Sequence, residues 1–180
     1  SLDFFNLPIT QLNFLNTLNP KDIDFSQNFL EKIGITKNFS LTPTGNKLKS
    51  YPFHPRVSRM LYEASKYNQE TFQIFLNDFA SIIEPKRPSH FINLAKKYFS
   101  PSAADKNAEI EFIYTVGFID QISKIRSNKN IELIHNNGEI YKVSNSISNQ
   151  IDLAHELWVI LSLDNKNEVI KMSPVNEEWL

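Results

Sequence analysis

The sequence predicts an α+β fold that is mainly α-helical, with a β module at the C-terminal end. Between Pro55 and Tyr98 the apolar residues recur every three or four positions, as in helices that bury one face. After Ser127 the period changes to two, the period of strands. The dipeptide Asn137-Gly138 is a strong signal for a tight turn between antiparallel strands. We therefore expect helices first and a sheet of about four strands after them.

The N-terminal part divides into a connector, residues 1–18, and a first folded unit, residues 19–67. The connector alternates short apolar clusters with polar residues. A helix is expected to begin at Asn19-Pro20 and to end at Gly34, since asparagine caps helix starts and glycine tolerates the left-handed backbone that follows helix ends. A short strand is expected over Phe39 to Leu41.

Two more helices complete the first unit. Thr42-Pro43 has the residues of a helix cap and first turn, and Pro52 ends that helix near Ser50. Pro55 begins a helix that buries Val57, Met60, Leu61 and Ala64 and exposes Arg56, Arg59, Glu63 and Lys66. A strand with two short helices predicts a winged-helix-like unit, in which Arg56 and Arg59 are candidate phosphate contacts. The alternative is that this basic face is simply solvated.

Residues 68–127 are expected to form a helical bundle. One helix begins at Asn68 and ends before Pro85, and a second begins at Pro88, with Ala95 and Tyr98 inward and Lys96 and Lys97 outward. The phenylalanines of the first helix are interpreted as core, not as a platform for stacking bases. A third helix is predicted from Ala108 to Arg126, and it is apolar nearly all round, which places it at the centre of the bundle.

Residues 128–180 are expected to form the β module. The chain ends at Trp179-Leu180 before a five-stranded barrel of the OB type closes, so a partial OB-like sheet is predicted. Its strands are expected at Ile131 to Ile134, Glu139 to Val143, Leu157 to Leu163 and Glu168 to Met172.

Composition restricts the classes of function. The content of 41% hydrophobic and 22% charged residues is typical of a globular protein, and no apolar run is long enough to span a membrane. Without cysteine there is neither a disulfide nor a thiolate metal site, which fits a cytoplasmic location. No phosphate-binding loop, Asp-Glu-x-His motif or metal-ligand spacing occurs. We assign no catalytic residue, no metal and no cofactor to this chain.

The near-neutral net charge of −1 conceals an asymmetry. Residues 42–99 contain nine Lys and Arg against four Asp and Glu, whereas residues 100–180 contain seven against twelve. A basic region of this kind is suited to binding a polyanion on one surface.

Three segments resemble the helicase-associated region of DEAH-box RNA helicases, most closely the bacterial HrpB-type branch. The first is Leu41 to Ala64, with Leu-Thr-Pro-Thr-Gly and His-Pro-Arg. The second is Val116 to Arg126, similar to the end of a helix in that branch. The third is Asn137-Gly138 followed by Leu157 to Asp164. They occur in the family's order, although Gln121 and Ser123 depart from its pattern and thin the basic cluster around Lys124 and Arg126.

The resemblance implies an order of winged helix, ratchet bundle and OB-like module downstream of two RecA-like motor domains. ATP and Mg²⁺ would bind in those motor domains. The expected partners are single-stranded RNA or DNA and the motor domains of the same chain, with no membrane. The candidate nucleic-acid contacts are Arg56, Arg59, Lys96, Lys97, Lys124 and Arg126.

Two other interpretations remain open. A standalone winged-helix regulator would read duplex DNA through the helix that begins at Pro55, usually as a dimer. A protein-interaction module would dock a partner on the acidic β region and bind no nucleic acid.

Overall fold

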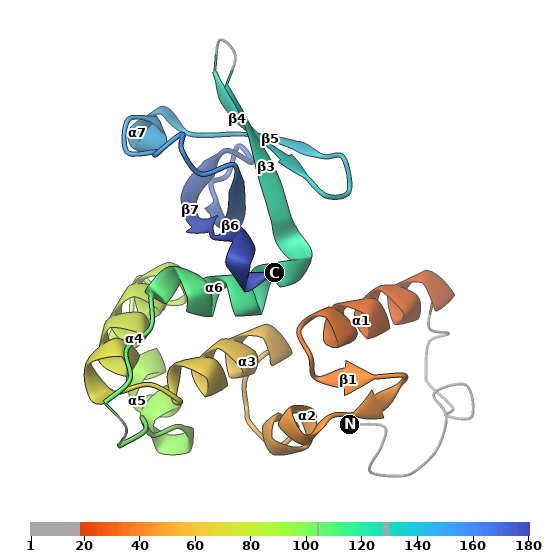
Figure 1. Cartoon of the computed structure of the whole chain (residues 1–180), viewed down its shortest axis with the longest axis vertical. Helices are drawn as coiled ribbons and strands as arrows, with labels where there is room; N and C mark the ends of the chain where they lie inside the picture. The colour runs from red at the N-terminus through yellow and green to blue at the C-terminus, as the bar shows by residue number, and fades with distance from the viewer. Residues whose placement is uncertain (1–18, 104, 128–129) are drawn as a thin grey trace. The chain divides into compact units, whose positions relative to one another are not determined.

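The structure is a computed structural model that describes residues 19–103, 105–127 and 130–180 (Figure 1). The chain divides into two compact units, of which the first ends at Arg59 and the second begins at Met60. No helix within the described ranges is both long enough and apolar enough to cross a membrane. The expected connector, residues 1–18, lies outside the described residues. The predicted domain limits remain predictions.

The first unit begins with a capped helix and a small hairpin. Its elements are α1 (Pro20–Lys32), β1 (Thr36–Lys37), β2 (Ser40–Leu41) and α2 (Pro43–Leu48). The side chain of Asn19 accepts a hydrogen bond from the Lys21 amide, and Gly34 follows the helix with a φ of 73°. Both expected ends of α1 are therefore confirmed. The strand expected over Phe39 to Leu41 is present as β2, although it begins at Ser40 because Asn38 and Phe39 form the turn to β1 with positive φ angles.

Thr42 and Gly45 join the hairpin to α2. The Thr42 hydroxyl accepts a hydrogen bond from the Gly45 amide, which confirms the predicted cap. The same hydroxyl lies 2.8 Å from the carbonyl oxygen of Gly34, to which it donates. The Thr42 amide donates to the carbonyl of Ile35 at 3.0 Å. These bonds hold the Ile35 carbonyl directly against the first turn of α2.

Helix α3 (Pro55–Ala64) begins at the proline that predicted it. Met60, Leu61 and Ala64 are fully buried, as expected. The prediction that Glu63 lies on the exposed face is wrong. Glu63 is only 5% exposed, and it forms an ion pair with Lys66 at 2.8 Å. A buried carboxylate needs such a partner, because an unpaired buried charge is strongly destabilising.

Three further helices follow in the second unit: α4 (Gln69–Ile83), α5 (Pro88–Tyr98) and α6 (Ile110–Phe118). Asn68 caps α4 by accepting from the Thr71 amide. Aromatic rings of Phe75, Phe79 and Tyr114 pack against one another with centroids 5.5–6.0 Å apart. Their burial confirms that these aromatic residues are core. Tyr98, expected inward, is 37% exposed instead.

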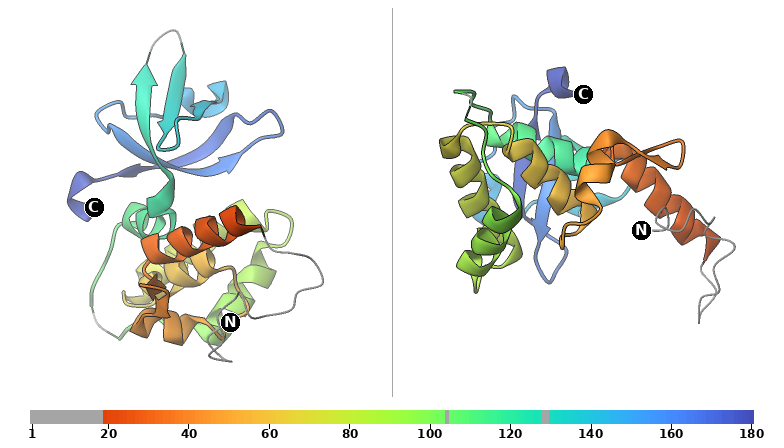
Figure 2. Two further views of the ribbon diagram at one scale, coloured as in Figure 1. Left: turned by 90° about the vertical axis from the view of Figure 1, so that its right-hand side faces the viewer. Right: turned by 90° about the horizontal axis from the view of Figure 1, so that it is seen from below.

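The third predicted helix is wrong in its second half. Helix α6 ends at Phe118, a single 3₁₀ turn covers Ile119–Gln121, and Ile122–Ser127 is strand β3. The expectation of a central position is correct for α6, which buries Ile113, Tyr114, Thr115 and Gly117 and contacts α4, β6 and β7 (Figures 1 and 2).

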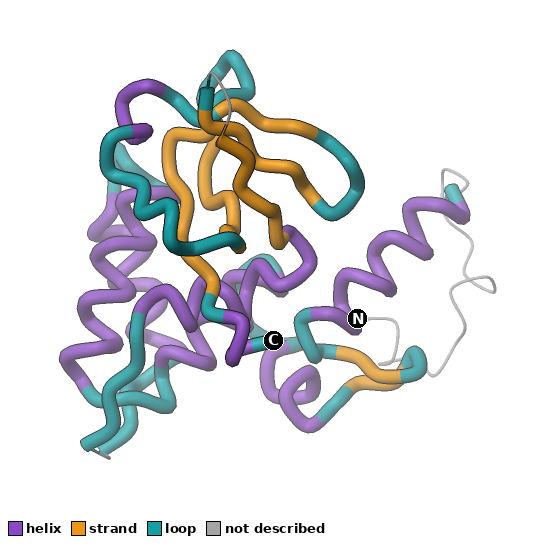
Figure 3. Tube along the Cα trace, turned by 45° about the horizontal axis from the view of Figure 1, so that its top comes forward, coloured by secondary structure: helices purple, strands orange, loops and turns teal. Residues whose placement is uncertain are grey.

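The sheet has five strands in the order β5-β4-β3-β6-β7, and all neighbouring pairs are antiparallel (Figure 3). Besides β3 these are β4 (Ile131–His135), β5 (Ile140–Lys142), β6 (Leu157–Leu163) and β7 (Val169–Val175). The expected turn at Asn137-Gly138 is present, with a φ of 87° at Gly138. The fifth strand is β3, the segment that had been predicted as helix.

The two edges of this sheet meet at one point. Val143 and Val169 form an isolated parallel bridge, and the Ser144 amide donates to the Val169 carbonyl at 2.9 Å. The short helix α7 (Asn145–Ser148), which was not predicted, follows directly. The sheet encloses a core of Leu133, Val143, Trp158, Ile160 and Val169. The sheet thus has one strand more than expected, and its OB-like character stays a prediction.

Candidate nucleic-acid interface

The two arginines of α3 contact α1 and the residue that follows it. The guanidinium of Arg56 lies over the ring of Phe29, 4.7 Å from its centroid. Phe29 also packs against the ring of His54, with centroids 5.7 Å apart. Nε of Arg59 donates to the Ile33 carbonyl at 3.1 Å. Both side chains therefore contribute to the packing of the first unit. A phosphate that binds either arginine has to compete with these internal contacts or be contacted alongside them.

Lys96 and Lys97 lie in the last turn of α5 and are exposed, as predicted. Within the described part of the chain neither side chain has an ion pair or hydrogen bond. They stand near the negative end of the helix dipole, where a positive charge is favourable. Their ammonium groups are available for a phosphate ligand without the loss of an internal contact.

Lys124 and Arg126 lie on β3 and not on a helix, and each forms an ion pair. Nζ of Lys124 is 2.9 Å from a carboxylate oxygen of Glu156, and this hydrogen bond raises the pKa of Lys124. Nε of Arg126 donates to Glu132, its cross-strand neighbour, at 3.1 Å. A phosphate would compete with a carboxylate at either position, so these two residues are the weakest of the six candidates.

The six predicted contacts therefore fall on three elements, as adjacent pairs on α3, α5 and β3. Residue spacing alone identified the pairs, but it did not reveal which cations have carboxylate partners. It also passed over Lys86 and Arg87, which are exposed on the loop before α5. The signal for them was present in the sequence, because no Asp or Glu occurs between Pro85 and Ala104.

Neither a metal centre nor a catalytic group emerges from the described residues. No three His, Asp or Glu side chains among them are placed to hold a metal ion. Asp152 and Glu156 lie in irregular backbone, and Glu156 is the partner of Lys124.

Comparison with known proteins agrees with the resemblance seen in the motifs. No family model and no curated protein matches the sequence. Among solved structures, that of the E. coli DExH-box NTPase HrpB is similar with a TM-score of 0.71 at 14% identity, covering 94% of this chain and 23% of that one. A second, described as the Escherichia coli DEAH/RHA helicase HrpB, has a TM-score of 0.64 at 15% identity, covering 93% and 23%.

The chain spans about a quarter of the length of the HrpB chains that it matches. At this level of identity the likeness establishes the fold. The α+β fold predicted from the sequence is confirmed, as is the structural resemblance to the HrpB-type branch. Over nearly all of its length, this chain has the fold of a part of the E. coli helicase HrpB.

Proposed function

We propose that this chain is a non-catalytic accessory region of an ATP-dependent DEAH-box helicase. In this role it guides single-stranded nucleic acid, RNA by analogy with the family, and packs on the RecA-like motor domains of its own protein. ATP and Mg²⁺ act in those motor domains, since this sequence has no phosphate-binding loop.

The observation that carries the proposal is the likeness to HrpB over 94% of the chain. The segment from Leu41 to Ala64 supports it independently, because the structure gives its signature residues physical roles. Thr42 caps α2, Gly45 lies against a backbone carbonyl, and Pro55 begins α3. A motif whose residues all have such roles is better support than a chance similarity of letters.

The three named modules of the family are part of this proposal. We assign α1 to α3 to the winged-helix-like module and α4 to α6 to the ratchet. The OB-like assignment of the sheet is supported by its five strands, by the parallel bridge between Val143 and Val169, and by α7 between β5 and β6.

Binding of fluorescently labelled single-stranded RNA at several salt concentrations tests the nucleic-acid role. The chain is expected to bind weakly and without sequence preference, with an affinity that falls as salt rises, because few phosphates are contacted. An excess of unlabelled single strand should displace the probe better than the same mass of duplex. No binding at 50 mM salt would contradict this role.

The variant Arg56→Gln with Arg59→Gln examines the α3 pair. It is expected to weaken binding and to lower the salt slope, and Lys32→Gln with Lys37→Gln is the matched control because it removes the same charge from the same unit. Thermal melting of both variants separates lost contacts from lost folding. An unchanged affinity and salt slope in the arginine variant would show that this face is only solvated.

Packing on motor domains is tested separately, through the gene and the protein. An upstream reading frame that encodes Gly-x-x-x-x-Gly-Lys-Thr and Asp-Glu-x-His supplies the motor domains, and the separately expressed domains should co-elute with this chain.

A regulator of duplex DNA is disfavoured by α3, whose Ser58, Met60, Leu61 and Glu63 are buried. Sequence-specific binding to duplex would restore that alternative.

A further inference from the structure

We propose that the outer face of α5 and the loop before it form a binding surface for a phosphate backbone. Its contacts are the side chains of Lys86, Arg87, Lys96 and Lys97, which together we call the α5 cation surface. This inference rests on the proposed nucleic-acid function and specifies where a strand is held. Lys86 and Arg87 belong to none of the motifs that carry the resemblance.

The charge of this segment is entirely of one sign. Between Pro85 and Ala104 the sequence contains four Lys and Arg and no Asp or Glu. The chain as a whole contains 19 Lys and Arg and 20 Asp and Glu, so a run of this length without acid departs from the average composition. Glu84 directly precedes this segment, and its carboxylate lies 2.9 Å from Nδ1 of His90.

Each of the four cations is exposed, and none has an ion pair or side-chain hydrogen bond within the described ranges. Other cations of the second unit differ in this respect, since four of them have carboxylate partners: Lys66 with Glu63, Lys124 with Glu156, Arg126 with Glu132 and Lys171 with Asp78. A phosphate at the α5 cation surface therefore displaces no internal ion pair.

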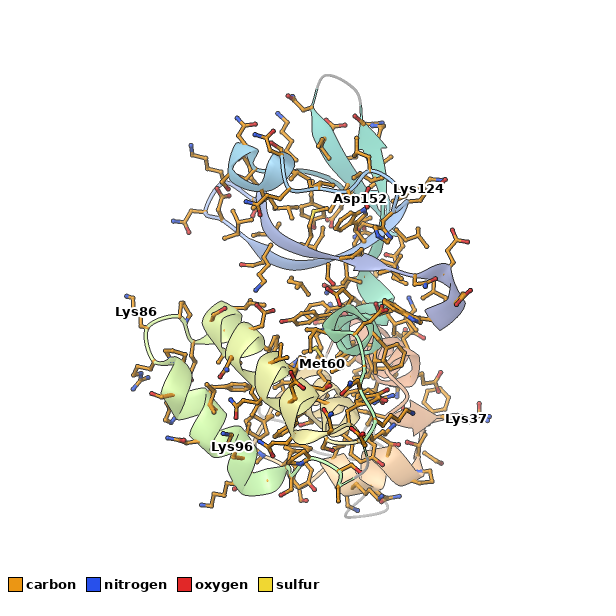
Figure 4. All side chains as sticks on the ribbon, turned by 60° about the vertical axis from the view of Figure 1, so that its left-hand side comes forward. Lys37, Met60, Lys86, Lys96, Lys124 and Asp152 are labelled. Carbon is orange, nitrogen blue, oxygen red and sulfur yellow. The ribbon has the colours of Figure 1, made fainter. Side chains whose placement is uncertain are left out.

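Helix geometry turns these side chains outward. Phe91, Ala95 and Phe99 form the buried line along α5 at a spacing of four residues. Lys97 stands two residues beyond Ala95, about 200° around the helix, on the opposite face. Figure 4 marks Lys86 on the loop that leads into α5 and Lys96 near the other end of the helix.

The surface is long enough to hold several phosphates. The helix of 11 residues is about 16 Å long. Phosphates of a strand that is stacked as in a duplex rise about 3.4 Å each, so this length corresponds to at most about five of them. One pair of cations at each end of α5 can therefore contact the same strand.

Helix stability does not account for all four charges. Lys96 and Lys97 do suit the negative end of the helix dipole. Lys86 and Arg87 precede the positive end, where cations are unfavourable, and α5 has neither a side-chain cap nor an acidic residue in its first turn. Lys86 and Arg87 thus lower the stability of α5 slightly. Binding of an external anion would explain why two cations occupy these positions.

The surface is expected to contact the backbone and not the bases. Reading single-stranded bases requires exposed flat side chains. On α5 the ring of Phe91 is buried, Tyr98 is 37% exposed, and the exposed imidazole of His90 is held by the carboxylate of Glu84. We therefore expect homopolymers of different bases to bind with similar affinity.

The test replaces all four cations with glutamine and measures the affinity for a labelled single-stranded RNA homopolymer between 50 and 300 mM salt. Because each phosphate contact contributes about 0.7 to the slope of log affinity against log salt, the slope is expected to fall by about 3. At 50 mM salt we expect an affinity loss of at least about tenfold. The control variant replaces Lys21, Lys32, Lys49 and Lys166 with glutamine, which removes the same charge elsewhere.

Four outcomes decide the matter once circular dichroism shows that both variants are folded. Loss in the α5 variant alone supports the α5 cation surface. Equal loss in both variants overturns it in favour of a net-charge effect. Unchanged binding by the α5 variant also overturns the α5 cation surface but leaves the proposed function intact. Absence of binding by the wild-type chain overturns both the surface and the nucleic-acid function. In that last case an acidic protein partner becomes the ligand to seek.

Discussion

Gly45 shows why a glycine occupies this position of the Leu-Thr-Pro-Thr-Gly segment. A Cβ atom at Gly45 would lie 2.1 Å from the carbonyl oxygen of Ile35, far inside contact distance. That carbonyl accepts a hydrogen bond from the Thr42 amide, and the Thr42 hydroxyl lies 3.1 Å from it, so it has little freedom to move. The glycine is thus required by a backbone contact within the first unit, independently of any ligand.

Gly45→Ala is therefore expected to destabilise the chain. Overpacking of this kind costs about 1–3 kcal/mol, which exceeds the gain of about 1 kcal/mol that alanine brings to a helix. Urea denaturation of the variant should show a lower free energy of unfolding than the wild type. The exposed neighbour Asn46→Ala is the control and should be neutral or slightly stabilising. Equal stability of the two variants would refute the close contact.

His54 offers a test based on pH. Its pKa is lowered from 6.5, first by burial and then by the charge of Arg56. The unfolded chain therefore binds more protons just below pH 6.5, so the free energy of unfolding rises with pH there. The stability that the neutral form of His54 contributes is complete above pH 6.5 and is lost as the pH falls below that value. The side chain is partly exposed, so the change in stability is small.

Proton NMR of the four histidines measures this pKa directly. His54 should titrate below pH 6.5, and Arg56→Gln should move its pKa upward, since the variant removes the second cause. Arg59→Gln serves as the comparison because Arg59 is not among the causes of the shift. A pKa of His54 at or above 6.5 in the wild type would show that the predicted burial is absent.

At the scale of elements, Asp78 links three parts of the second unit. This residue of α4 accepts one hydrogen bond from the Tyr114 hydroxyl on α6 and another from Nζ of Lys171 on β7, the latter at 2.6 Å. Burial and the hydrogen bond to Asp78 raise the pKa of Tyr114. Tyr114 is nearly fully buried, whereas the side chains of Asp78 and Lys171 are more than a third exposed.

The two bonds should differ in strength. Tyr114→Phe removes a bond between a buried hydroxyl and a carboxylate and is expected to cost about 1–2 kcal/mol. Lys171→Gln breaks an exposed ion pair and should cost less than about 1 kcal/mol. Urea denaturation compares the two. Tyr141→Phe, which loses an exposed bond to Glu139, is the control for the tyrosine change. A larger effect for Lys171→Gln would reverse this account.

The elements that could be predicted from the sequence are those with their own start and stop signals. Asn19, Thr42 and Asn68 cap helices, and Asn137-Gly138 turns a hairpin. The run from Ile110 to Ile125 has only weak signals inside it, Gly117, which lies within α6, and Asp120, and a largely apolar run does not separate helix from strand. Its change to β3 depends on pairing with β4, the next strand, and with β6, which follows much later in the chain.

The candidate site was predictable to a lesser degree. Sequence spacing correctly placed Lys96 and Lys97 on an exposed face, whereas Arg56 and Arg59, also expected to be exposed, are only partly exposed. It cannot find the carboxylates of Glu132 and Glu156, which reach Arg126 and Lys124 only through the folding of the sheet. The charge pattern over tens of residues is therefore more informative about binding than any single lysine.

At the scale of the whole molecule, the charge is divided between a basic region and an acidic one. Residues 42–99 include α3 and α5, and they have nine basic against four acidic residues. Residues 100–180 include the whole sheet and have seven against twelve. Because a nucleic acid is attracted by the summed field as well as by single contacts, it should approach the first region and be repelled by the second.

Crosslinking of the complete chain to a photoreactive single-stranded RNA, followed by mass spectrometry of the peptides, measures this distribution. We expect crosslinked peptides within residues 42–99 and few within 122–175, and the crosslinks should fade as salt rises because screening shortens the range of the field. A heated and cooled sample, in which folding is lost, controls for unspecific reactivity. Crosslinks concentrated on β3 to β7 would instead place the strand on the sheet, and the ion pairs of Lys124 and Arg126 would then have to open upon binding.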